Sequence, residues 1–191
     1  MTLNFFSINI LKLGIEETTS RIIFPLLQHV GILWLSGSTN IAHEHFITNI
    51  IKQRMFVAID QLNVSPLINA KKFLLFLPNQ ENHELSLLFA SFMLRSRGQK
   101  VTYLGTSTPL DDLNKIYKLH NPDVIFCAMN SSNSTMPVQV YIQTLSRNFP
   151  NTRILITGSQ VVKRRDLKLP SNCQIIGSPA DFLVCLDQIT K

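Results

Sequence analysis

The residues with the clearest chemical potential are Glu81 and His83, which stand two positions apart in the segment 78–86. An imidazole can act as a metal ligand, as a base or as a helix cap. A carboxylate beside it can hold the second ring nitrogen and so fix the tautomer and basicity of the ring. The same two residues would also occur if His83 were only a solvated histidine at a helix end. The pair alone leaves these interpretations open.

The cysteines do not complete a metal site around this pair. Zinc is held by three or four His, Cys or carboxylate ligands, whereas Cys127, Cys173 and Cys185 lack metal-type spacing. They are typical of small apolar core residues in a reduced, cytoplasmic protein without disulfides. If His83 binds a metal, we expect that metal to arrive already coordinated within a cofactor.

A second polar group interrupts an apolar helix nearer the N-terminus. Glu44, His45 and Thr48 lie on a helical stripe that is otherwise apolar. Buried polar groups need hydrogen-bond partners. A bound nucleoside would supply such partners for Glu44 and His45, and so would pairing with each other or with the backbone.

The first part of the chain is predicted to be helical. Apolar spacing predicts three helices, over residues 3–13, over residues 15–35, and up to about residue 62. Gly14 and Gly37 should end the first two, and Pro25 should kink the second. Ser38 or Thr39 should cap the third, which is apolar on nearly every side and is therefore expected to be buried.

After residue 70 the pattern alternates between apolar strands and helices. Strands are predicted over residues 73–77, 101–104, 124–128, 154–157 and 174–176. Helices are predicted over about 83–97, 109–119, 137–148 and 179–190, with a short one over 160–168. This alternation indicates a parallel sheet covered on both faces. We therefore expect an α/β fold: a helical bundle over residues 1–66, then a flavodoxin-like, doubly wound, five-stranded parallel sheet over residues 70–191.

This architecture directs attention back to Glu81 and His83. Ligands of doubly wound sheets bind at the carboxyl ends of the strands, near the point where the strand order reverses. The loop after the first predicted strand carries both residues. It contains no GxGxxG dinucleotide fingerprint and no P-loop, and the chain has no GxSxG nucleophile elbow. We find no second catalytic constellation and expect no enzyme acting alone.

Composition excludes several broad classes. Hydrophobic residues make up 45% of the 191 residues and charged residues 16%, which argues against a disordered chain. No apolar run approaches the roughly 20 residues of a membrane span, and no signal peptide is predicted. The net charge of +6 lies wholly downstream of residue 62. Its densest run, residues 163–165, is typical of a solvated loop rather than of a nucleic-acid patch.

The loop after the first strand also carries a family resemblance. Glu81-x-His83-x-x-Ser86 resembles the D/E-x-H-x-x-G motif of cobalamin-binding domains. The resemblance implies that His83 is the lower ligand of the cobalt and that Glu81 orients it. It also implies a groove, lined by small residues, for the nucleotide tail of the cofactor.

Later marks of the same family are present in altered form. They fall on Cys127-Ala-Met129 and on Gly158-Ser159, and the segment around Gly105 resembles the family's second strand-to-helix turn. Three residues depart from the pattern: Ser86 and Ser159 replace glycines, and Cys127 replaces a serine. The resemblance implies that all of these residues line the cofactor site.

The helical part resembles a narrower group. Trp34, followed ten residues later by Glu44-His45, is similar to the W-x9-E-H signature of light-sensing, adenosylcobalamin-dependent regulators of the MerR type. The resemblance implies a helical cap in which these residues line the adenosyl pocket. Without it, core packing is the better interpretation of Trp34. Leu35 stands where light-sensing members carry a histidine that ligates cobalt after photolysis, so that photoproduct is not expected here.

Together these features predict a cobalamin-binding sensory domain of a transcriptional regulator. Adenosylcobalamin is the expected cofactor and methylcobalamin the alternative form. Ligand binding or light would change the homo-oligomer and hence DNA binding by an attached helix-turn-helix module, which these residues do not contain. The alternatives are a corrinoid carrier for methyl transfer and a non-binding, protein-interaction descendant of the fold. The departures at Ser86, Cys127 and Ser159 motivate the last.

Overall fold

The computed structural model describes residues 2–35, 40–132 and 136–190. The chain divides into two compact units, Met1–Asn63 and Val64–Lys191, and each is described by itself. Among the described residues, no helix combines the length and the apolar character that a membrane crossing requires.

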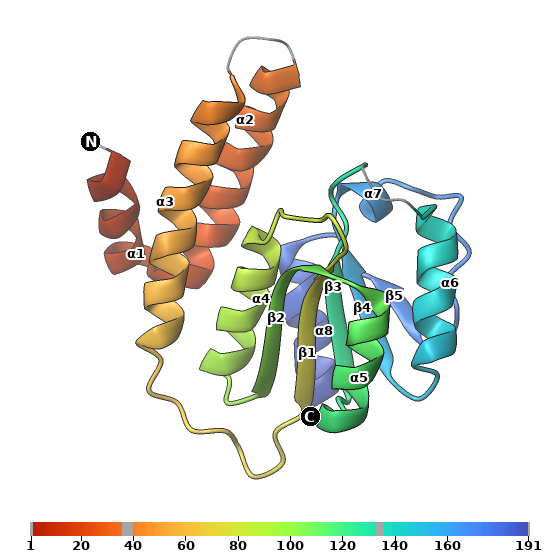
Figure 1. The fold of residues 1–191 in the computed structure, drawn as a ribbon. Coiled ribbons are helices and arrows are strands. Elements are labelled where there is room, and N and C mark those ends of the chain that lie inside the picture. Colours follow the sequence, from red (N-terminus) through yellow and green to blue (C-terminus); the bar gives the residue numbers. More distant parts are fainter. Residues whose placement is uncertain (1, 36–39, 133–135, 191) are drawn as a thin grey trace. The chain divides into compact units, whose positions relative to one another are not determined.

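The N-terminal unit is built from helices (Figure 1). They are α1 (Thr2–Thr18), the π-helix η1 (Thr19–Ile23), α2 (Phe24–Leu35) and α3 (Ile41–Asp60). Gly14, at φ 78 and ψ 168, is non-helical and separates two helical segments within α1, as the sequence predicted. The wide π turn ends at Ile23, two residues before Pro25, where a regular α-helix would need an N–H that proline lacks.

Two expectations for the third helix need correction. Asn40 caps α3, because its side-chain oxygen accepts a hydrogen bond from the His43 N–H at 3.1 Å. The predicted caps Ser38 and Thr39, and the break at Gly37, lie outside the described residues. The predicted burial on nearly every side is wrong, because a small helical unit covers only part of α3. Ile50, Ile51 and Met55 are buried, and Phe46, Phe56 and Val57 are exposed.

The C-terminal unit contains the predicted parallel sheet. Its strands are β1 (Lys72–Pro78), β2 (Lys100–Thr108), β3 (Val124–Ala128), β4 (Arg153–Thr157) and β5 (Cys173–Ile175). All neighbouring strands pair in parallel, in the order β2-β1-β3-β4-β5. The prediction of a doubly wound, five-stranded α/β sheet is confirmed.

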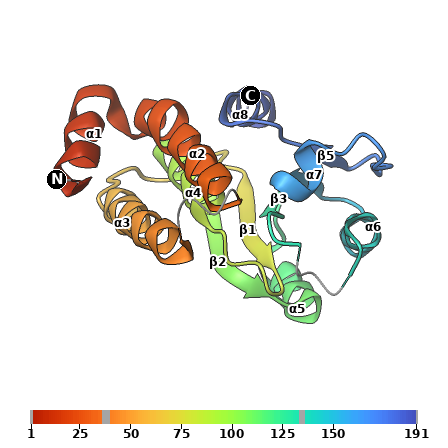
Figure 2. The same cartoon turned by 90° about the horizontal axis from the view of Figure 1, so that it is seen from above.

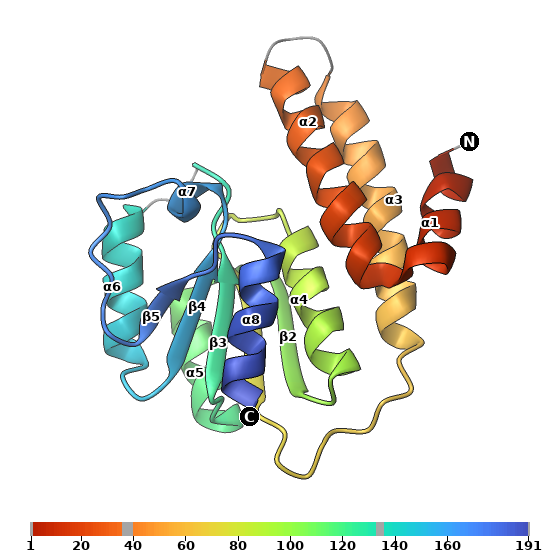
Figure 3. The same ribbon diagram turned by 180° about the vertical axis from the view of Figure 1, so that it is seen from behind.

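Helices cover both faces of this sheet. They are α4 (Leu85–Ser96), α5 (Leu110–His120), α6 (Val138–Asn148), α7 (Ser159–Val162) and α8 (Pro179–Thr190). Figures 2 and 3 show α4 and α8 on one face and α5 and α6 on the other. The helix predicted over residues 160–168 is reduced to the four residues of α7, since the charged residues that follow offer no apolar face to pack.

Successive residues of β3 face opposite layers of the unit. The ring of Phe126 contacts Phe182 of α8, with the centroids 5.2 Å apart. Ile125 and Cys127 belong instead to the core that packs against α5 and α6. The strand order reverses at β1, which lies between β2 and β3. The loops that follow β1 and β3 therefore leave the same edge of the sheet side by side.

Candidate functional site

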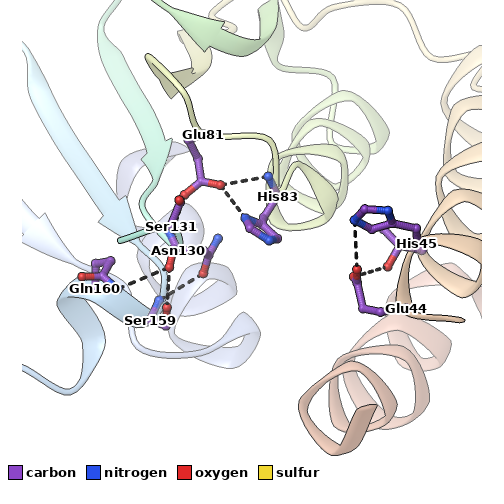
Figure 4. Close-up of polar contacts among 9 residues, drawn as sticks. Glu44, His45, Glu81, His83, Asn130, Ser131, Ser159 and Gln160 are labelled. Carbon is purple, nitrogen blue, oxygen red and sulfur yellow. Dashed lines mark hydrogen bonds and ion pairs between the residues drawn. The ribbon is translucent and has the colours of Figure 1, made fainter. Parts of the chain in front are cut away.

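The site is built around the carboxylate of Glu81, in the loop between β1 and α4. This side chain is buried, at 4% exposure, although the loop itself is at the surface. Its Oε2 atom accepts hydrogen bonds from the backbone N–H groups of Asn130 and Ser131, both at 2.6 Å. Its Oε1 atom accepts from the backbone N–H of His83 at 2.9 Å and contacts Nδ1 of the same residue at 2.6 Å. Figure 4 shows this carboxylate between the two loops.

These contacts fix the charge of the carboxylate. Burial alone would raise the pKa of Glu81. The hydrogen bonds from the side chain and backbone of His83, and from the backbone of Ser131 and Asn130, outweigh burial and lower the pKa from 4.5 to about 2. Glu81 is therefore an ionised acceptor at neutral pH.

The charge of Glu81 in turn fixes the tautomer of His83. An ionised carboxylate offers no proton, so the ring nitrogen that contacts it, Nδ1, must carry the hydrogen. In the neutral imidazole, Nε2 then presents the lone pair that a metal can take. The His83 side chain is 63% exposed, so an incoming group can reach it.

The loop after β3 is held by the turn after β4. Met129 N donates to Thr157 O at 2.8 Å, and Gln160 N donates to Met129 O at 3.0 Å. Gly158 lies between these contacts at φ 110, and a Cβ atom there would overlap the backbone of Met129. Only glycine allows the two loops to approach this closely.

Other residues predicted for the site lie in α4, in β2 and at the carboxyl edge of the sheet. Ser86 is in the first turn of α4, and its Oγ atom is buried without a hydrogen-bond partner among the described residues. Gly105 is in β2, at φ 79, beside an irregularity in the pairing with β1. Met129 and Glu81 both line a small hollow at the carboxyl edge of the sheet.

The structure does not bring Cys127 to this centre. Its side chain is fully buried in the core against α5 and α6. Burial raises the pKa of this thiol, and the nearby Cys173 raises it further, which keeps the group neutral.

Sequence reasoning missed Asn130 and Ser131, which contact Glu81 through backbone atoms. Their types carry no chemical signal, since any residue except proline offers the same N–H group. Their position did carry one. They lie just beyond the end of β3, the neighbour of β1, after one intervening residue at the carboxyl edge of the sheet.

In the N-terminal unit, the polar residues of α3 contact one another. Glu44 Oε1 accepts a hydrogen bond from Thr48 Oγ1 at 2.7 Å, and Glu44 Oε2 lies 3.6 Å from His45 Nε2. The Glu44 side chain is 25% exposed and that of His45 is 63% exposed. The backbone of Trp34 lies in α2, but its side chain is outside the described part of the chain.

A bare metal ion would need several ligands from the protein itself. No group of three or more His, Cys, Asp or Glu side chains that could hold a metal occurs within residues 2–35, 40–132 and 136–190. Within these ranges, His83 is therefore not part of a cluster of three or more such ligands.

Comparison with known proteins gives relatives over much of the chain. No protein-family model matches it. The HTH-type transcriptional repressor CarH of Myxococcus xanthus is 30% identical over 130 residues, which are 68% of this chain and 42% of CarH. CarA of the same organism is 29% identical over 113 residues, 59% of this chain and 37% of CarA. The chain spans less than half the length of either repressor.

Solved structures agree with the fold described above. A cobalamin-binding protein from Desulfitobacterium hafniense has a TM-score of 0.51 and 17% identity, covering 84% of this chain and 77% of its own. The monomethylamine corrinoid protein of Methanosarcina barkeri has a TM-score of 0.69 and 11% identity, covering 85% and 78%. At these identities the likeness concerns the fold alone. This fold and the similarity to the two repressors agree with the family resemblance found in the sequence.

Proposed function

We propose that this chain is a cobalamin-binding sensory domain of a transcriptional regulator. One observation carries the proposal: an imidazole with a fixed tautomer stands at the carboxyl edge of the sheet, beside the strand-order reversal. A metal that takes few ligands from the protein has its other positions filled by water or by its own cofactor. Cobalt in a corrin ring meets that condition.

The residues around His83 fit such a cofactor. A polar atom of a nucleotide tail entering beside α4 would give the buried Ser86 Oγ the partner that it lacks among the described residues. The hydroxyl of Ser159 donates to Asn130 O at 3.0 Å, so its polar end is already satisfied within the protein. Cys127 faces the other layer of the sheet, so its substitution for serine does not alter the α4 side.

We propose the following roles for the residues of the site. Glu81 would hold the proton on Nδ1 of His83, and Nε2 of His83 would bind the cobalt. Ser86, Gly105, Met129, Gly158 and Ser159 would border the lower face and the tail.

The adenosyl form is the cofactor that we propose. The support is the W-x9-E-H pattern and the carboxylate of Glu44, which lies with His45 and Thr48 on an otherwise apolar stripe of α3. Trp34, Glu44 and His45 would surround the nucleoside. Bound adenosylcobalamin would supply a light-sensitive cobalt–carbon bond. Its binding would shift the oligomeric state only through a different affinity for each state, and an attached helix-turn-helix module would read that shift on DNA.

Retention of the chromophore tests the proposal. Purified protein mixed in the dark with adenosylcobalamin should keep the visible absorption through gel filtration. His83→Ala should weaken retention and change the spectrum. His120→Ala is the matched control, since His120 lies at the end of α5 and contacts Thr102 near the start of β2, away from the carboxyl edge.

Three outcomes separate the interpretations. Failure of adenosyl-, methyl- and hydroxocobalamin alike to co-elute would refute cobalamin binding and favour an interaction module. Retention of the methyl form, with transfer of its methyl group to a thiol acceptor by a partner enzyme, would favour a corrinoid carrier. Retention of the adenosyl form, with a change of oligomer on illumination, supports the sensory role.

A further inference from the structure

The two N–H groups that bind Glu81 belong to a loop that needs its own support. Asn130 N and Ser131 N both reach Glu81 Oε2 at 2.6 Å. A backbone N–H points wherever its loop is held, so the direction of these two bonds depends on what fixes the loop. This support is what ultimately sets the position of the carboxylate and of His83.

The side chain of Asn130 supplies that support together with Ser159. Asn130 Oδ1 accepts the backbone N–H of Ser159 at 3.0 Å, and Ser159 Oγ donates back to Asn130 O at 3.0 Å. We name these two reciprocal bonds the Asn130–Ser159 clasp. Gln160 Nε2 adds a longer bond to Asn130 O at 3.4 Å. Figure 4 shows Ser159 and Gln160 joined to Asn130, and Glu81 beside Ser131 and joined to His83.

The serine at position 159 gives this series a bond that glycine cannot make. Glycine would keep the N–H bond to Asn130 Oδ1, but it would lose the bond from Oγ to Asn130 O. The serine that departs from the Gly-Gly pattern therefore adds a hydrogen bond to Asn130, in the loop that binds Glu81. Gly158, which precedes it, has no such freedom because Met129 occupies the space of a side chain.

We propose that the Asn130–Ser159 clasp positions His83 by fixing the loop that holds Glu81. In this role Asn130 and Ser159 are positioning residues, which act through Glu81 and need touch no metal. The proposal rests on the function proposed above, since it concerns the same imidazole. It assigns to Asn130 a role that its residue type did not suggest.

The protein without cofactor provides the first test. Nitrogen-15 NMR of the His83 ring reports the tautomer, and hydrogen exchange reports how firmly the amides of residues 130 and 131 are bound. In Asn130→Ala and Ser159→Ala, we expect those amides to exchange about tenfold faster, and we expect the Nε2–H tautomer of His83 to gain population. Ser159→Thr keeps the hydroxyl and should restore both readouts.

A second clasp in the same unit supplies the control. The side chain of Gln139 accepts from Lys168 N at 2.8 Å and donates to Lys168 O at 2.9 Å, also joining segments 29 residues apart. Gln139→Ala removes a comparable pair of bonds far from Glu81 in the hydrogen-bond network. It should leave the exchange of amides 130 and 131 and the tautomer of His83 unchanged.

Binding of hydroxocobalamin provides the second test. We expect Asn130→Ala and Ser159→Ala to weaken its binding about fivefold, an effect that Gln139→Ala should not share. The proposal is overturned if Asn130→Ala and Ser159→Ala leave the tautomer and the exchange rates as in the wild type, or if Gln139→Ala changes them equally. Should Asn130→Ala fail to fold, Ser159→Ala, which removes a single bond, still decides. If the wild type binds no cobalamin, the proposed function fails, while the cofactor-free measurements still judge the clasp.

Discussion

The substitution Glu81→Gln tests the structural role of the buried carboxylate most sharply. Four N–H groups point at its two oxygens: those of Asn130 and Ser131, and the backbone and ring of His83. An ionised carboxylate can accept all four. The glutamine amide has one acceptor oxygen and one NH₂ donor group, so one pair of N–H groups would face another donor.

The lowered pKa of Glu81 gives the size of the effect. A fall from 4.5 to about 2 corresponds to about 3 kcal/mol in favour of the ionised form in the folded protein. We therefore expect Glu81→Gln to lower the free energy of unfolding by about 3 kcal/mol at pH 7. Urea denaturation followed by circular dichroism measures this difference.

The dependence on pH provides an internal check. Because the folded pKa lies below the unfolded one, ionised Glu81 contributes its full stability above about pH 4.5 and loses it as the pH falls toward 2. The gap between wild type and Glu81→Gln should close over that window. Asp112→Asn, which breaks an exposed ion pair with Lys115, should cost less than about 1 kcal/mol. A Glu81→Gln variant within 0.5 kcal/mol (about the spread of ordinary surface substitutions) of wild type at pH 7 would refute the reasoning.

Three further substitutions test the elements that carry the site. Gly158→Ala should destabilise the C-terminal unit by about 2 kcal/mol or more, because φ is positive and Met129 occupies the space that a Cβ atom would need. Gly31→Ala is the control, since the space around Gly31 is open and the protein should not be destabilised. Thermal denaturation compares the two variants. Asn40→Ala should cost about 1 kcal/mol of stability in urea denaturation through loss of the α3 cap, and an unchanged value would contradict that cap. Tyr141→Phe removes a buried hydroxyl that lacks a partner among the described residues, so calorimetry should find the variant at least as stable as the wild type, and a clear loss would reveal a missing contact.

The architecture could be predicted from the sequence because the strand and helix patterns indicated the same fold. Apolar strands alternating with helices predict a parallel sheet, and the rule for ligand sites in such sheets predicts a site at Glu81 and His83. The burial of α3 was overestimated because apolar content reports what a helix can bury, while its neighbours decide what it does bury. Phe46 and Val57 remain exposed for that reason.

The support of the site was harder to predict because it runs through backbone atoms and paired loops. The N–H groups of Asn130 and Ser131 carry no residue-specific signal. The clasp with Ser159 depends on two segments 29 residues apart meeting at the carboxyl edge. The position of Cys127 depends on which face of β3 it occupies, and a shift of one residue along a strand reverses that face.

The most direct test of the account asks which nitrogen binds the cobalt. Protein labelled with nitrogen-15 at histidine and loaded with the cobalt(II) form of cobalamin would be examined by electron paramagnetic resonance. If the His83 imidazole is the lower ligand, the threefold nitrogen splitting of the unlabelled protein becomes twofold on labelling. The twofold splitting is then lost in labelled His83→Ala. Threefold splitting that persists in the labelled protein would assign the ligand to the cofactor's own base and would contradict the account.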